Sequence, residues 1–293
     1  MDEPQATTRS HAERVAARDG YFAPESVIRR MGNSPLTPLL GGGSAVLPQV
    51  AHPLVAVGVV EHSDYERHLW SRLLGTLRAL YLIAYGTKAE ADRAGAIVRA
   101  VHAHVHGETT SALGAFPAGT RYSAADPDLM LWVHATLVYS SLGIYHRYVH
   151  RLSAGEQESY YREMALVARI FGTPADVIPA TLADFGDYLR GRFASPEIQV
   201  TEPARRVADV ILRAPLPLPL RLLAPAHRLS TAALLPERLR REYGLTWTPG
   251  RAAALRGAAQ SIKLAAYPLF LAAARISPRP AGETRSRLPA EPS

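Results

Sequence analysis

Apolar residues recur at helical spacing along most of the chain, from about residue 24 to about residue 274. Alanine, leucine, arginine and glutamate dominate this region and alternating β-branched residues are rare, so the pattern favours helices over strands. We therefore expect an all-α protein with one large helical domain. The predicted helices cover residues 24–31, 45–51, 54–60, 64–84, 88–106, 127–149, 155–171, 176–192, 203–212, 231–243 and 249–274.

Glycine and proline indicate where these helices are interrupted. Gly41 to Gly43 are predicted to form a loop, after which Ser44 caps the short helix 45–51. The pair His52-Pro53 should then end or kink that helix, because the residue before a proline avoids the helical conformation. Segment 215–219 alternates proline with leucine, so it is predicted to be an extended connector.

Polar residues mark several of the expected helix starts. Ser63 and Ser153 are predicted N-caps, and Glu156 follows Ser153 at the spacing of a capping box. Asp126 precedes Pro127, which combines a favoured N-cap with a favoured first helical residue. The helix that starts at residue 127 is therefore the best-defined element of the sequence.

The two ends of the chain differ in composition from its middle. Residues 1–20 are predicted to be a mobile arm and residues 277–293 a disordered tail, which leaves 21–276 as the folded domain. Residues 1–17 lack the apolar core of a secretory signal, and the apolar run 129–145 is shorter than the roughly 20 residues that a bilayer requires. We expect a cytoplasmic protein whose membrane contact is at most peripheral.

Composition restricts the possible chemistry. The 293 residues carry a formal net charge of +7, but lysine occurs only at positions 88 and 263, and the arginines are scattered. Scattered arginines are typical of solvated helix faces, so nucleic acid is not expected as a partner. The chain has no cysteine, which excludes disulfides, iron–sulfur clusters, thiol catalysis and thiolate-bound or covalently attached haem.

One histidine lies in a segment that should be buried. Residues 129–145 contain no Asp, Glu, Lys or Arg, and His134 stands near their middle. Burying an unpaired polar group costs about 1–3 kcal/mol, so this imidazole needs a hydrogen-bond partner or a metal. It could be an ordinary core histidine, and iron in a haem would also satisfy it.

A second group of histidines lies on the preceding predicted helix. Arg99, His102 and His106 would share one helix face, whereas His104 would point elsewhere. Two helices joined by about 20 residues can hold a flat cofactor between them, each offering one axial group. The alternative is a zinc or non-haem iron site made of His102, His106 and His134, although no carboxylate is evidently placed as a general base.

At these positions the chain resembles the latex-clearing protein (rubber oxygenase) and mycophenolate-pathway oxygenase family. No single motif carries the resemblance, which extends over about residues 20–250. The matching residues are Gly41 to Ser44, Gln49 to Pro53, Val60 to Ser63, Arg99, His102, Val105, Gly107, Tyr122, Asp126, Pro127, Leu131 to Leu137, Leu235, Pro236, Arg240, Tyr243 and Gly244.

The resemblance implies a globin-like helical core that holds non-covalent haem b, with His134 as the proximal iron ligand. Arg99 and His102 align with the distal arginine and lysine of rubber-cleaving members. Because His102 replaces that lysine, polyisoprene is not the expected substrate. The implied function is an oxygenase that acts on a hydrophobic small molecule with dioxygen or peroxide.

In this reading Arg99 would pair with a haem propionate or donate a hydrogen bond to the oxidant. His102 would relay protons on the distal side, or ligate the iron. The alternative is then a non-catalytic bis-histidine sensor or electron-transfer protein. The apolar wall of the haem site would come from Met130, Leu131, Leu137 and Val138. Neither the substrate nor the oligomeric state follows from the sequence.

Overall fold

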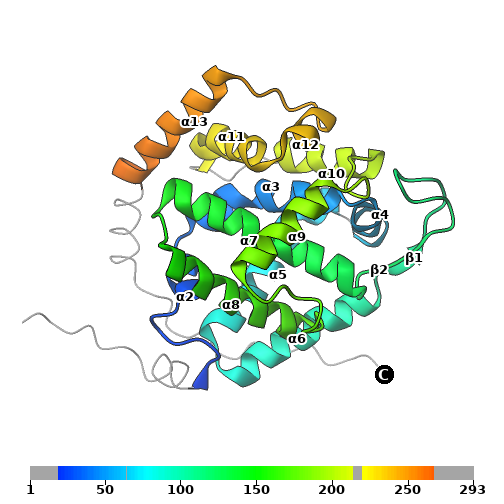
Figure 1. Ribbon diagram of the computed structural model, residues 1–293, viewed down its shortest axis with the longest axis horizontal. Coiled ribbons are helices and arrows are strands. Elements are labelled where there is room, and N and C mark those ends of the chain that lie inside the picture. The colour runs from blue at the N-terminus through cyan, green and yellow to red at the C-terminus, as the bar shows by residue number, and fades with distance from the viewer. Residues whose placement is uncertain (1–18, 64, 214–219, 267–293) are drawn as a thin grey trace, which may run out of the picture.

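The computed structural model describes residues 19–63, 65–213 and 220–266, which form a mostly helical single domain (Figure 1). Nearly all of the predicted N-terminal arm, the connector 215–219 and the tail 277–293 lie outside the described residues. The prediction of one large, mostly helical domain is confirmed for the described part. The globin-like arrangement is not shown and stays a prediction.

Helix α3 (Leu36–Val50) lies at the centre of the molecule (Figure 1). It packs against α7 (Pro127–Tyr148), α10 (Glu202–Arg213) and α11 (Ala224–Leu234). Leu47 and Val50 of α3 join the main core, which also contains Trp132 and Val138 of α7. A smaller cluster joins the other side of α3 to α11 and α13 (Pro249–Ser261).

The predicted loop at Gly41 to Gly43 is wrong, because α3 runs straight through it. A Cβ atom on Gly43 would lie 2.5 Å from Thr231 Oγ1 on α11, closer than real Cβ atoms come. The glycine therefore serves close helix packing, and its conformation is helical. Ser44 is buried inside α3 and does not cap a helix.

The break at His52-Pro53 is confirmed. The α3 helix ends at Val50, and α4 (Pro53–His62) starts with Pro53 in its first turn. The backbone N–H of Leu54 donates a hydrogen bond to Nδ1 of His52, which makes His52 the N-cap of α4. No single helix among the described residues is long and apolar enough to cross a membrane. The pair α3 and α4 has sufficient length and apolar character only when the two are taken together, and this pair is bent by 110°.

Helices α5 (Tyr65–Tyr85) and α6 (Lys88–Ala103) pack against each other, and α6 also packs on α8 (Ala154–Phe171). The α6 helix ends three residues earlier than predicted. The chain then forms a two-stranded antiparallel hairpin, β1 (His106–Glu108) and β2 (Arg121–Ser123), that the sequence pattern did not predict.

The best-supported helix starts are confirmed. Asp126 accepts hydrogen bonds from the backbone N–H groups of Asp128 and Leu129, and Pro127 opens α7. Ser153 and Glu156 form the capping box that opens α8. Ser63 ends α4 and donates its hydroxyl hydrogen to the carbonyl of Val59. Its N-cap role stays a prediction, because residue 64, at the expected helix start, lies outside the described residues.

Proline divides the C-terminal region more finely than predicted. Pro236 separates α11 from the short α12 (Glu237–Glu242), where one helix was expected over 231–243. The α13 helix is followed by a π-helical turn over Ile262–Ala266, and the predicted continuation over 267–274 lies outside the described residues. The remaining elements are α2 (Val27–Gly32), α9 (Leu182–Ala194) and a 3₁₀ turn over Leu220–Leu223.

Candidate haem site

His134 lies in the middle of α7 and only 7% of it is exposed. One ring nitrogen is hydrogen-bonded to the backbone of Met164 on α8, and this bond raises the pKa of the imidazole. Such an effect requires an acceptor, so the carbonyl of Met164 receives the ring N–H. Burial has the larger, opposite effect and lowers the pKa of His134 to about 4, which keeps the ring neutral at pH 7.

The other ring nitrogen of His134, Nε2, is buried and has no hydrogen-bond partner among the described residues. Because Nδ1 carries the proton that Met164 accepts, Nε2 holds a free lone pair. Metal-ligating histidines in proteins usually have this arrangement, in which a carbonyl fixes the tautomer and the second nitrogen is left for the metal. The chemistry of this nitrogen therefore fits a haem iron.

His102 is half-buried on the last turn of α6, and its Nδ1 is likewise buried, with no partner in the part of the chain that the structure describes. Burial lowers the pKa of His102, which favours the neutral ring. His104 differs, since it is exposed and its Nδ1 contacts the carbonyl of Ala100 on its own helix.

Arg99 is exposed, and its guanidinium is hydrogen-bonded to α8. Nη1 donates a hydrogen bond to the carbonyl of Ile170 in the last turn of α8. The side chain passes between two glycines: a Cβ atom would lie 3.1 Å from Arg99 Nη1 at Gly95 and 2.9 Å from Arg99 Cδ at Gly172. Gly172 has φ +106°, a conformation that favours glycine, so it both ends α8 and leaves room for Arg99.

The four residues predicted to form the apolar wall all lie on α7. Leu131 and Val138 are buried, whereas Met130 and Leu137 are half-buried. The methyl carbon of Met130 would lie 3.5 Å from a Cβ atom on Gly172, which places Met130 close to the Arg99 side chain. Met130 thus connects the α7 helix to the segment that holds Arg99.

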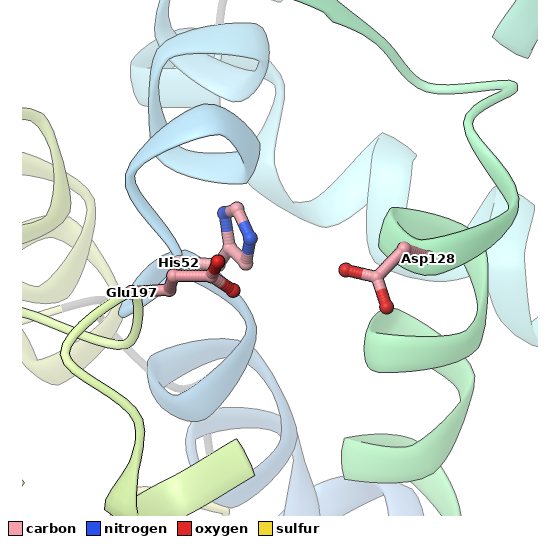
Figure 2. Close-up of side chains that lie close together, drawn as sticks. All are labelled: His52, Asp128 and Glu197. Carbon is pink, nitrogen blue, oxygen red and sulfur yellow. The ribbon is translucent and has the colours of Figure 1, made fainter. Parts of the chain in front are cut away.

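The helical spacing predicted for His102 and His106 is wrong, because α6 ends at Ala103 and His106 lies on β1. Among the described residues, the ligand atoms of His102, His106 and His134 do not all lie within 4.8 Å of one another, as atoms around one metal ion would. The group that does meet that geometric condition consists of His52, Asp128 and Glu197 (Figure 2).

Arg192 pairs with both carboxylates of this second group. Its Nη2 lies 3.0 Å from Asp128 Oδ2, its Nη1 lies 3.0 Å from Glu197 Oε2, and its guanidinium carbon lies 5.8 Å from the ring centre of Trp132. Burial and then the Arg192 charge lower the pKa of His52 to about 3. The cluster is therefore an ion-pair network that joins the starts of α4 and α7 to the end of α9.

The β1–β2 hairpin borders an open cavity of about 520 Å³. Tyr122, which lines the cavity, donates its hydroxyl hydrogen to Glu61, and His62 Nε2 lies 3.1 Å from the same hydroxyl. Burial and the Glu61 carboxylate raise the pKa of Tyr122. This network attaches the hairpin to α4 and is separate from His134.

Sequence reasoning did not identify Met164, Gly172 or Arg192. A main-chain acceptor such as the Met164 carbonyl has no sequence signature, because every residue offers one. Gly172 did have a signal, since a glycine directly after a predicted helix commonly takes the left-handed conformation.

The domain is thus mostly helical and contains a buried, neutral histidine whose Nε2 has no partner among the described residues. Comparison with known proteins identifies the family. Residues 29–264 match the catalytic-domain family described as ER-bound oxygenase mpaB/B'/Rubber oxygenase, and the chain belongs to that family. The family consists of oxygenases.

The curated relatives are uncharacterised. A protein of Mycobacterium bovis and one of Mycobacterium tuberculosis are each 26% identical to the chain over 211 residues, which cover 69% of this chain and 78% of each relative. No solved structure matches the chain significantly.

Proposed function

We propose that this protein is a haem b-dependent oxygenase that acts on a hydrophobic small molecule, with His134 as the proximal ligand. The single observation that carries the proposal is the buried, unpartnered Nε2 of His134, whose ring is oriented by the Met164 carbonyl. Membership in an oxygenase family supports the same chemistry. Haem would supply an iron centre able to activate dioxygen or peroxide.

The chain's own residues would have distinct tasks. His134 would hold the iron through Nε2, and the Met164 carbonyl would keep its tautomer and ring plane fixed. Burial lowers the pKa of His102 and so favours its neutral form, in which the buried Nδ1 could accept a proton and return it. Arg99 would provide the positive charge at the C-terminal side of α6, for a propionate or for the oxidant.

The experiment is an absorption spectrum of the purified protein, with the extracted porphyrin identified by mass. We expect a Soret band that His134→Ala abolishes and that added imidazole restores by entering the vacated space. The matched control is His104→Ala on α6, which removes an exposed ring and should leave the band unchanged. A fully helical, colourless and iron-free wild-type protein would overturn the proposal.

A second candidate function has support from one observation. Nδ1 of His102 is also buried and unpartnered, so His102 could serve as a second axial ligand in a non-catalytic haem sensor or electron carrier. Ferrous spectra with carbon monoxide distinguish the two functions. Ready carbon monoxide binding favours the oxygenase, whereas a low-spin spectrum that responds only after His102→Ala favours the bis-histidine protein.

A further inference from the structure

Helices α5 and α6 carry an exposed apolar surface that no described residue covers. Leu74 and Tyr81 on α5 are each 61% exposed, and Ile97 and Val101 on α6 are 60% and 57% exposed. Four large apolar side chains this exposed on two adjoining helices mark an interaction surface, because soluble proteins rarely leave such residues together in water.

The residues of each helix are grouped on its outward side. On α5, Leu74, Arg78 and Tyr81 follow one another at spacings of four and three residues, and all are exposed. On α6, Arg93, Ile97 and Val101 are spaced by four residues, whereas the buried Ala91, Ala94 and Gly95 face the body of the protein. We call the six exposed residues the α5–α6 face.

The charged groups of the α5–α6 face are both basic. Arg78 and Arg93 are exposed, and neither forms an ion pair with a described residue. The nearest acids on α6 are engaged elsewhere. Glu90 belongs to the capping box with Thr87, and Asp92 accepts a hydrogen bond from Tyr21.

We propose that the α5–α6 face docks onto an anionic lipid bilayer surface. Arginines interleaved with leucine, isoleucine, valine and tyrosine give the side-chain set that lies in a membrane interface, with apolar groups inserted and guanidinium groups among the phosphates. The helix segment Leu73–Tyr85 is apolar but too short to cross a bilayer, which suits a position on the surface. A second copy of the chain fits less well, because its face would bring arginine against arginine.

This inference does not rest on the haem, and its test is independent of the spectrum. The full-length protein is sedimented with phosphatidylcholine vesicles that contain or lack phosphatidylglycerol. We expect binding to the anionic vesicles, weak binding to the neutral ones, and release by high salt because salt screens the attraction.

Two double variants test whether the α5–α6 face is the part of the protein that binds the vesicles. Arg78→Gln with Arg93→Gln should weaken partitioning roughly 25-fold, at about fivefold for each arginine near the surface. Leu74→Ser with Ile97→Ser should weaken it by about tenfold or more through lost apolar insertion. Circular dichroism checks that each variant is folded. Replacing the two exposed arginines leaves the core intact, so this variant remains informative even if the Leu74→Ser, Ile97→Ser variant misfolds.

Matched controls come from α13, at the other end of the molecule from α6 (Figure 1). Leu264→Ser removes a leucine that is 71% exposed from the turn after α13, and Arg256→Gln removes an exposed arginine of α13. Both should bind vesicles like the wild type. The proposal fails if the wild type ignores anionic vesicles, or if the controls weaken binding as much as the face variants. It also fails if the wild type is a dimer that the face variants convert to monomers, because a second copy would then cover the face.

Discussion

Arg99 on α6 donates a hydrogen bond to the carbonyl of Ile170 in the last turn of α8, so the two helices are joined through a residue of the candidate site. The bond satisfies a carbonyl that the helix end would otherwise leave unpaired. It also holds the guanidinium of Arg99 in one position before any ligand binds.

Gly172→Ala should disturb this arrangement. The added Cβ would lie 2.9 Å from Arg99 Cδ, and alanine is strained at φ +106°. We expect a loss of about 1–2 kcal/mol in the free energy of unfolding, measured by urea titration, together with a changed Soret spectrum. Gly155→Ala in the first turn of α8 is the control, since its Cβ meets nothing within 4 Å and stability should not fall. Equal effects of the two substitutions would disprove the role given to Gly172.

Gly43→Ala should separate α3 from α11. Its Cβ would lie 2.5 Å from Thr231 Oγ1 and 3.1 Å from His227 Nε2, so these side chains or the two helices must shift. The expected cost is about 1–3 kcal/mol, measured by chemical denaturation. Gly42→Ala, one position earlier, meets nothing within 4 Å and should stabilise the helix slightly. A stable Gly43→Ala protein would show that the glycine is not needed for close approach.

Arg192→Met should weaken the junction of α4, α7 and α9. It removes the ion pairs with Asp128 and Glu197 and the contact of the charge with Trp132. We expect a loss of about 1–2 kcal/mol in thermal or urea unfolding, because both carboxylates are partly solvated. Arg190→Met, on the same helix, removes an exposed pair with Asp187 and should cost less than about 0.5 kcal/mol. If zinc raised the melting temperature of the wild type and the Asp128→Asn variant lost that effect, the cluster would be a metal site after all.

The stability of the protein should fall as the pH is lowered from 6.5 toward 4. The folded state holds His52 neutral with a pKa of about 3, whereas the unfolded chain takes up that proton near pH 6.5. Protons therefore favour the unfolded state across this interval, by about 2 kcal/mol at pH 5 for this one residue. His52→Asn keeps an N-cap oxygen for Leu54 and cannot titrate, so its unfolding free energy should vary less with pH. Identical pH profiles would contradict this explanation.

The sequence predicted α7 and α8 well because their signals are local. Asp126 with Pro127, and Ser153 with Glu156, act within one turn of the chain and need no distant partner. His134 was identified by the same logic, since an uncharged run around a histidine already indicates burial.

The predictions that failed concern features that depend on residues far apart in the chain. Whether Gly43 makes a turn or a contact depends on Thr231, which lies far along the chain, so the local pattern alone predicts a loop. The three-residue strands of the hairpin are too short to show a period. The Met164 carbonyl and the Arg192 network arise only when separate helices come together, so neither could be assigned beforehand.

The central position of α3 has a consequence for how the chain reaches its folded state. A helix with three successive glycines has little tendency to form alone, so its order must be imposed by the helices around it. Fragments that lack either α7 or α11 should therefore leave α3 disordered. Because the central helix becomes ordered only with its neighbours in place, we expect the domain to fold and unfold cooperatively.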